Sequence, residues 1–235
     1  MFCKSRLRPH FPALATILLL WLALAATARS QTSANLTLAS EYAARGMALD
    51  TRPALQLRVE HDAESAGLAG WYAGGFASPV DIGGRTQGQL LAYAGRAARL
   101  SSTLSWDAGV TSTVFLRDRT LDYHEFYGGL TLTRGSIRVF YSPAYYGEGR
   151  TAYLDLTGVL PLGDRLHVAL HAGLLHPIGA YDGLPAPGNG GDVRIALGAE
   201  VAAVSLEAGW QIKAHNYLEG ARPASALTAS ASLRY

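Results

Sequence analysis

The C-terminal stretch Ser225-Ala-Leu-Thr-Ala-Ser-Ala-Ser-Leu-Arg-Tyr235 alternates between two kinds of side chain. The mainly apolar set is Ser225, Leu227, Ala229, Ala231, Leu233 and Tyr235, and the smaller, more polar set is Ala226, Thr228, Ser230, Ser232 and Arg234. Because side chains alternate across a strand, this pattern predicts a strand with one apolar and one polar face. In a soluble domain such a terminal strand is an exposed edge, which proteins usually avoid. A closed barrel in a membrane has no edge, and it places a terminal aromatic at headgroup level.

The same alternation recurs upstream. Residues 102–116 show it most clearly, because Leu104, Trp106 and Val110 oppose small or polar residues at the odd positions. A strand longer than ten residues fits a tilted membrane crossing better than the ~5–6 residues typical of a soluble strand. Such segments together predict an all-β, up-and-down antiparallel barrel of about 12 strands, an even number as bacterial barrels require. The facing of residues 68–78 stays open.

The first of these strands is predicted over residues 33–46. Its polar face carries Glu41 and Arg45, and residues 47–52 follow as a short polar loop. We expect the last strand to close the barrel against residues 36–45, because a closed sheet must join its first and last strands.

The connections between the predicted strands alternate in character. Odd connections are longer and rich in Gly, Pro or charge; one contains Pro79, Gly83 and Gly84, another follows Pro143 at a predicted strand end, and residues 176–192 form the longest. Even connections are mostly short turns, as at residues 133–135, 161–164 and 202–203. Short periplasmic turns and longer external loops are typical of outer-membrane barrels. A soluble meander has no reason to alternate in this way.

The N-terminal residues have the features of a secretory signal. Lys4, Arg6 and Arg8 precede an apolar run over residues 11–26, and small residues follow at Ala26-Thr27-Ala28. This order predicts a signal peptide at residues 1–28, cleaved after Ala28 or near Ser30, and a barrel at residues 29–235. The run falls short of the ~20 residues that a retained spanning helix needs. We therefore expect export to the outer membrane of a Gram-negative cell.

Composition excludes several classes of function. The only cysteine of the 235-residue chain, Cys3, lies in the predicted signal, so the mature chain has no disulfide, thiol nucleophile or cysteine-ligated metal. The 20 basic and 18 acidic residues are nearly balanced and scattered, which gives no footprint for nucleic acid. We expect no cofactor.

Several short motifs occur in an order that resembles a known family. They are Ser40-Glu-Tyr-Ala-Ala-Arg-Gly46, Pro53-Ala-Leu-Gln56, Gly70-Trp-Tyr-Ala-Gly74, Tyr123-His-Glu125, Tyr141-Ser-Pro143 and Tyr153-Leu-Asp155. This order is similar to the TorF-type family of proteobacterial proteins regarded as porins, from about Leu36 to the C-terminus. The resemblance implies a barrel and a pore but little about the solute. The Met-Ala-Leu-Asp segment after Gly46 departs from the Ser/Gln-rich residues that many members carry there.

The C-terminal residues also resemble those of bacterial outer-membrane barrels, which commonly finish on Phe or Tyr with apolar residues two and four positions back. Leu233 and Tyr235 fit that arrangement. The resemblance implies that these two residues are an assembly signal for the barrel-assembly machinery rather than part of a solute site.

The polar faces of the predicted strands carry charge of both signs. The expected lumen-lining residues are Glu41, Arg45, Arg58, Glu60, Asp107, Glu125, Arg138, Asp155, Arg165, His167, His171, Arg194, Glu200, Glu207 and Lys213. Opposite charges in a narrow lumen create a transverse field that filters small polar solutes. The alternative is a set of ion pairs that plugs the barrel, since buried charges must be paired. Twelve strands lie between plugged eight-stranded barrels and open porins.

Three functions follow from this interpretation. The first is a narrow channel for passive passage of small hydrophilic solutes, and the second is a closed structural or receptor-like barrel that acts through its external loops. The third is an outer-membrane lipid hydrolase, which needs a Ser–His pair near the outer leaflet, and His124 beside Glu125 is the nearest approach to its base. The sequence carries no motif of such enzymes, so we predict no catalytic residues.

Metal binding and other partners can also be judged from the sequence. His167 and His171 would lie about 13 Å apart on a strand, too far to share a metal. The expected partners are outer-membrane lipid and lipopolysaccharide, the assembly machinery and small polar solutes.

Overall fold

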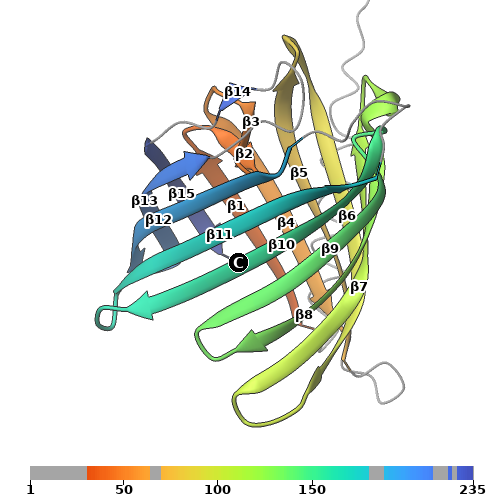
Figure 1. Ribbon diagram of the computed structural model, residues 1–235. Helices are drawn as coiled ribbons and strands as arrows, with labels where there is room; N and C mark the ends of the chain where they lie inside the picture. The colour runs from red at the N-terminus through yellow and green to blue at the C-terminus, as the bar shows by residue number, and fades with distance from the viewer. Residues whose placement is uncertain (1–30, 64–69, 180–187, 214–221, 224–226, 235) are drawn as a thin grey trace, which may run out of the picture.

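A computed structural model describes residues 31–63, 70–179, 188–213, 222–223 and 227–234 (Figure 1). The predicted signal peptide lies outside these residues. Within the described ranges no helix is long and apolar enough to cross a membrane.

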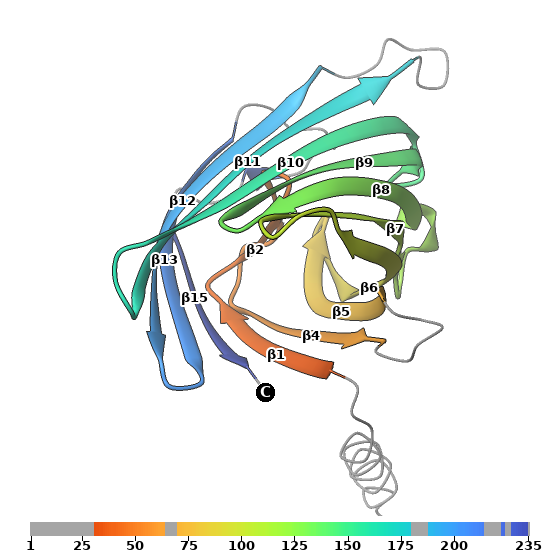
Figure 2. The ribbon, with the colours of Figure 1, turned by 90° about the horizontal axis from the view of Figure 1, so that it is seen from below.

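Twelve of the described strands form a closed antiparallel barrel, which confirms the predicted fold. Each strand pairs with its neighbour in the chain, and the ring closes where β15 pairs with β1 (Figures 1 and 2). The strands are β1 (Gln31–Ala39), β4 (Ala54–Asp62), β5 (Trp71–Ile82), β6 (Arg85–Arg99), β7 (Leu104–Phe115), β8 (Tyr123–Leu132), β9 (Gly135–Tyr145), β10 (Gly149–Pro161), β11 (Leu166–Ile178), β12 (Gly190–Val201), β13 (Val204–Lys213) and β15 (Leu227–Arg234).

The closing contact has the expected register. Leu36 pairs with Leu233 on the outer face, and Thr37 pairs with Ser232 on the inner face, where their hydroxyls lie 2.8 Å apart. On its other side β15 pairs with β13 from Val204 to Trp210. The C-terminal strand is therefore held by ladders on both edges, as the sequence predicted for β1 and β15. Tyr235 lies outside the described residues.

The barrel has an apolar outside and a polar inside. In β12, for example, Val193, Ile195 and Leu197 are exposed on the outer face, whereas Arg194 points inward. Residues 71–78, the strand part of the segment whose facing the sequence left undecided, follow the same rule, because Trp71 is exposed outside and Tyr72 lines the interior. An outer apolar band around a polar lumen is typical of a transmembrane barrel.

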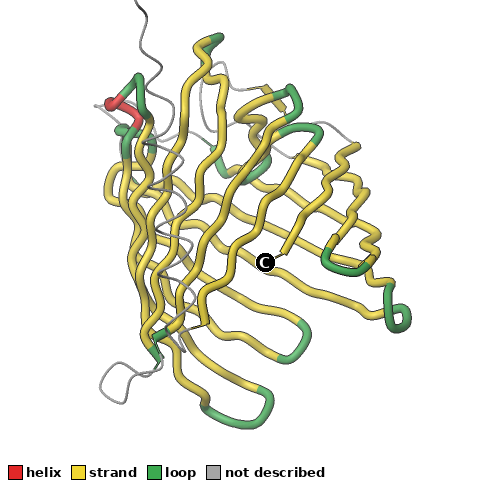
Figure 3. Tube along the Cα trace, turned by 180° about the vertical axis from the view of Figure 1, so that it is seen from behind, coloured by secondary structure: helices red, strands yellow, loops and turns green. Residues whose placement is uncertain are grey.

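The two ends of the barrel differ, as Figure 3 shows. One end, here called the turn end, has the short connections at residues 100–103, 133–134, 162–165 and 202–203. The other, here called the loop end, carries η1 (Arg119–Leu121) and the inward-folded segment described below.

Two proline-containing segments predicted as loops or strand ends are parts of strands. β5 continues through Pro79 to Ile82, and β6 begins at Arg85, so Gly83 and Gly84 alone form the turn. Both glycines have positive φ, as a two-residue hairpin turn requires. Likewise β9 continues past Pro143, which is exposed on the outer face, to Tyr145. The connection predicted at residues 176–192 is shorter, because β11 extends to Ile178 and β12 begins at Gly190.

The largest correction concerns the first predicted strand, which ends at Ala39 rather than Gly46. The Ser40 backbone bonds with Ala229, and the chain then turns into the barrel as β2 (Tyr42–Ala44) and β3 (Met47–Asp50). We call residues 41–50 the inward hairpin. It forms a three-stranded sheet with β14 (Arg222–Pro223), and Figure 2 shows β2 within the ring of barrel strands.

The segment predicted as a polar loop, residues 47–52, is thus partly a buried strand. Met47 and Leu49 are buried against inward-facing side chains at the loop end of the barrel. The wall contributes Val80, Phe115, Tyr123, Tyr145, Tyr146, Tyr153 and Leu175 to this cluster. Burial of apolar area outweighs the polar appearance of the segment, so the hairpin folds inward.

We expect the outer face to tolerate a charge only at its ends. Ile195 lies near the middle of β12 and is 55% exposed, and Ile195→Arg should lower the free energy of unfolding by about 2–4 kcal/mol in lipid vesicles. The matched control is Leu162→Arg, because Leu162 is 58% exposed but lies in a turn-end connection. Denaturant titration measures both, and equal effects would contradict a lipid-facing position for Ile195.

Candidate functional site

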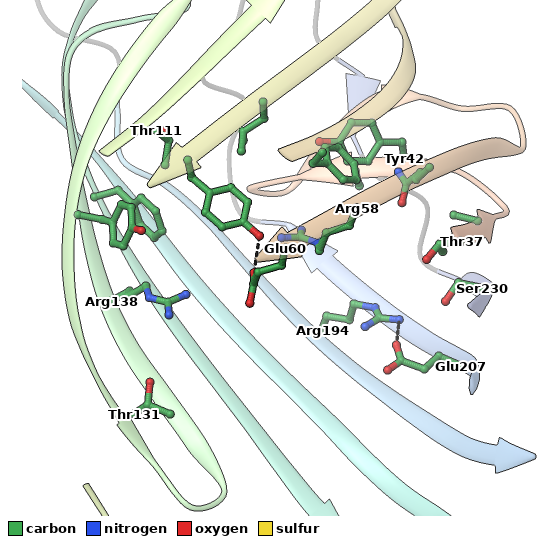
Figure 4. A pocket seen from close by; sticks show the side chains of 18 of the residues that line it. Thr37, Tyr42, Arg58, Glu60, Thr111, Thr131, Arg138, Arg194, Glu207 and Ser230 are labelled. Carbon is green, nitrogen blue, oxygen red and sulfur yellow. Dashed lines mark hydrogen bonds and ion pairs between the residues drawn. The ribbon is translucent and has the colours of Figure 1, made fainter. Parts of the chain in front are cut away.

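The interior of the barrel contains a polar cavity of about 780 Å³. It extends from the inward hairpin, at Glu41 and Tyr42, toward the turn end at Ser105 and Thr131. Figure 4 shows side chains from opposite walls that point into it, among them Arg58 and Arg194. Of the residues predicted to line the lumen, those at the cavity are Glu41, Arg58, Glu60, Asp107, Arg138, Arg194 and Glu207.

One ion pair spans three strands over a glycine. Asp107 on β7 pairs in register with Gly129 on β8, and Gly129 pairs with Arg138 on β9. Because Gly129 has no side chain, Arg138 lies across it and reaches the Asp107 carboxylate at 3.0 Å. The buried carboxylate is thereby neutralised without a direct neighbour on the adjacent strand.

Tyrosines use inward glycines in the same way. Tyr72, Gly95, Gly109 and Tyr127 form one row across β5 to β8, and the two hydroxyls meet 2.6 Å apart above the glycines. The Tyr72 hydroxyl also donates to Asp107 at 2.9 Å. Tyr72 and Tyr127 therefore hold the Asp107 side of the wall in place.

A third row is Glu60, Gly74 and Tyr93, where the Tyr93 hydroxyl donates to the Glu60 carboxylate. Tyr72, Tyr93 and Tyr127, the tyrosines of these two rows, were not among the residues that the sequence predicted for the lumen. In each row an inward tyrosine lies in register with an inward glycine. This signal can be recognised only when the pairing of the strands is known.

The opposite wall carries histidines and carboxylates. His167 lies across Gly198 with its Nε2 3.8 Å from Glu207, which also accepts from Arg194 at 2.8 Å. His171 lies between Asp155 and Asp192, with its Nε2 2.8 Å from Asp192. Each histidine thus has acidic neighbours of its own. Among the described residues no group of three or more His, Cys, Asp or Glu is arranged to hold a metal ion.

Arg45 lies among aromatic side chains at the loop end. It stands at the tip of the inward hairpin, where Arg45 and Gly46 have φ of 50° and 76° and form the two-residue turn between β2 and β3. Its guanidinium carbon lies 4.3 Å from the ring centre of Tyr153, 4.9 Å from Tyr145 and 5.4 Å from Phe140. Its Nη2 lies 2.7 Å from the buried carboxylate of Glu125.

This arrangement corrects the expected placement of Glu41 and Arg45. They do not share the face of a barrel strand, because the chain leaves β1 before Glu41. Arg45 instead crosses the lumen from the hairpin to β8, and Glu125 is the wall residue that receives it. We call Glu125, Phe140, Tyr145 and Tyr153 the Arg45 cage.

The outer part of the hairpin is fastened separately. Arg52 donates from Nε and Nη2 to the Asp50 carboxylate at 3.0 and 2.9 Å, and it also reaches Thr86 on β6. These hydrogen bonds from Arg52 hold the pKa of the Asp50 carboxyl below its ordinary value. Tyr42 packs on Phe76 at a centroid distance of 5.6 Å.

The remaining predicted residues lie at the ends of the barrel. Arg165 is exposed in the turn between β10 and β11, since β11 begins only at Leu166. Glu200 lies near the turn end and accepts from Ser205 at 3.0 Å. Lys213 pairs in register with Asp192, but its side chain is outside the described part. Leu233 is exposed on the outer face.

Comparison with protein-family models finds a match to a bacterial family. The model of a family described as "bacterial protein of unknown function", Gcw_chp, matches residues 23–231. A search of curated proteins finds no significant match.

Solved structures share the fold. The KdgM porin is 10% identical, with 88% of this chain and 98% of that chain covered and a TM-score of 0.51. The NanC porin is also 10% identical, with 87% and 98% covered and a TM-score of 0.54. A chain from work on in-meso crystallization of membrane proteins is 15% identical, with 87% and 83% covered and a TM-score of 0.54. At these identities the likeness concerns the fold alone.

We expect the glycine beneath Arg138 to be essential for the ion pair. A Cβ at Gly129 would lie 2.5 Å from the carbonyl oxygen of Ile137 and closer still to Arg138 Cγ. Gly129→Ala should lower the free energy of unfolding by roughly 1–3 kcal/mol, because overpacking displaces Arg138 from Asp107. Gly128→Ala is the control, since its Cβ would meet only the carbonyl oxygen of Asp107, at 3.8 Å. Equal unfolding curves for the two variants in detergent would contradict the requirement for a glycine beneath Arg138.

Proposed function

The chain belongs to the Gcw_chp family of bacterial proteins, and we propose that it is an outer-membrane barrel forming a narrow channel for small hydrophilic solutes. The observation that carries this proposal is the charged cavity of about 780 Å³ inside a closed ring of strands. A packed protein core would fill such a space with side chains. A polar space inside a barrel with an apolar outer face is instead what a hydrated path for solutes requires.

Further support comes from the similar structures. Two of them are named porins, and both share most of their length with this chain. The order of motifs from Ser40 to Asp155 additionally favours the TorF-type family of the sequence analysis. The proposal includes its orientation, with the turn end in the periplasm and the loop end outside, and it includes lipid and lipopolysaccharide as the partners of the outer face.

The lumen supports selectivity by paired charges. Arg138 with Asp107 and Arg194 with Glu207 lie at the cavity, so a solute meets opposite charges at close range. Such an arrangement favours small polar molecules whose hydration can be replaced by contacts with these charged groups. Arg58, stacked at 5.4 Å on Phe76, adds a cation on the hairpin side of the lumen.

A second candidate is a closed barrel that acts through its external loops. The observation in its favour is the apolar cluster around Met47 and Leu49, which fills the loop end. In the channel proposal this cluster makes the path narrow, and in the second it seals the barrel.

A lipid hydrolase is not part of the proposal. Such an enzyme needs a serine hydroxyl within reach of a histidine ring. His124 is exposed on the outer face, and the neighbouring Ser142 donates its hydroxyl to the His124 backbone carbonyl at 2.9 Å instead.

The channel is tested by single-channel recording of purified, refolded protein in a planar bilayer. We expect small discrete conductance steps from the wild type. Replacing residues 41–50 with a Gly-Ser linker should enlarge the steps severalfold, because the hairpin narrows the loop end. A Gly-Ser replacement of the exposed turn at residues 162–165 is the control and should leave the steps unchanged. No steps from the wild type at any salt concentration would overturn the channel and favour the closed barrel.

The proposed use of the last strand by the assembly machinery has its own test. Deletion of Tyr235 should reduce the amount of protein in the outer membrane while export continues, and Tyr235→Phe should preserve assembly because it keeps the aromatic ring. Fractionation of cells followed by heat-modifiable migration in gels measures both. Normal outer-membrane levels of the deletion variant would argue against an assembly signal at Tyr235.

A further inference from the structure

We propose that the Arg45 cage is a binding site for organic cations with a guanidinium or ammonium head, which the chain's own Arg45 fills in this structure. The inference rests on the proposed function in one respect, namely that a solute reaches the cage through the lumen. A cation that binds there would compete with Arg45 and release the inward hairpin.

The cage belongs to the barrel wall and not to the hairpin. Glu125 lies on β8, Phe140 and Tyr145 on β9, and Tyr153 on β10, and β9 pairs with both β8 and β10. The site therefore persists in the barrel when its occupant leaves. Phe140 and Tyr153 are also neighbours, with ring centroids 6.3 Å apart and ring planes tilted by 46°.

The chemistry of the cage selects a cation. Three aromatic ring centres lie within 5.4 Å of the guanidinium carbon, and ring faces attract positive charge. The Glu125 carboxylate is buried and lies 2.7 Å from Nη2, so it supplies the opposite charge. An anion or a neutral sugar would leave that buried carboxylate without a counter-charge.

The present occupant is held imperfectly. Arg45 Nη1 is buried without a hydrogen-bond partner, so one donor group of the guanidinium is unsatisfied. In addition, Arg45 adopts a φ of 50°, in the left-handed region that non-glycine residues rarely occupy. A free cation can orient itself without this backbone constraint.

The cage adjoins the lumen cavity. Phe140 lines the cavity, and so does Thr111, whose hydroxyl donates to Glu125 at 3.5 Å. The cavity itself carries five carboxylates, from Glu41, Glu60, Asp62, Asp107 and Glu207, and three guanidinium groups, from Arg58, Arg138 and Arg194. An acidic lumen concentrates cations next to the cage.

Competition for the cage couples the binding of a ligand to the release of the inward hairpin. The wall binds either Arg45 or a free cation, so a free cation shifts the population toward the released hairpin. By this argument the ligand class of the cage is also the solute class that opens the channel.

The test uses Arg45→Ala, which empties the cage but leaves its wall intact. Isothermal titration of the refolded variant in detergent with guanidinium chloride should show binding about tenfold tighter than in the wild type, where Arg45 competes. Arg52→Ala is the matched control, because Arg52 lies two residues beyond the hairpin and outside the cage, paired with Asp50. The double variant Arg45→Ala/Glu125→Gln should lose the binding, and sodium chloride should give none.

A second measurement needs no variant. In the wild type, hydrogen exchange of residues 41–50 should accelerate with guanidinium on the order of 50 mM, far below the molar range that unfolds proteins. Equal concentrations of sodium chloride and urea should have no effect. Exchange unchanged by guanidinium, or equal binding by Arg45→Ala and Arg52→Ala, would overturn the cage as a ligand site. Cage binding in a protein that shows no conductance would contradict the channel alone.

Discussion

The pairing of β1 with β15 is the constraint on which the rest of the structure depends. Without it both strands would expose unpaired backbone groups, which lipid cannot satisfy. With it the sheet closes into a ring, so the residues of each strand alternate between the inner and the outer face. The same contact shows both sides at once, since Leu36 faces Leu233 outside while Thr37 and Ser232 exchange a hydrogen bond inside.

Closing the ring at twelve strands creates an interior that the wall must partly fill. The chain fills it in two ways. Near the middle, long side chains lie flat across glycines of the adjacent strand, as Arg138 does over Gly129 and Tyr127 over Gly109. At the loop end the inward hairpin supplies Met47 and Leu49 to an apolar cluster. The first device accounts for several inward glycines and tyrosines, among them Gly95 and Gly109 beneath Tyr72 and Tyr127.

The sequence alone predicted the barrel and the alternation of its apolar and polar faces, because period-two alternation is a local property. It did not predict the inward hairpin. Residues 40–46 continue the alternation of β1, and the turn at Arg45 and Gly46 offers no proline or asparagine to mark it. Pro79 and Pro143 caused the opposite error, because they indicated a loop and a strand end where the strands continue. Proline is tolerated within these barrel strands near the loop end.

The partners of the inward charges could not be predicted, because each pair depends on register between strands. Asp107 and Arg138 are separated by a whole strand, and their contact exists only because the residue between them is glycine. Arg45 finds Glu125 from a segment that is not in the wall at all. Two properties of the sequence therefore determine a charged lumen. Alternation determines which side chains point into it, and the register between strands determines which of them stay accessible to a solute. Because of the register, the packing at the loop end and the chemistry of the lumen depend on the same few residues.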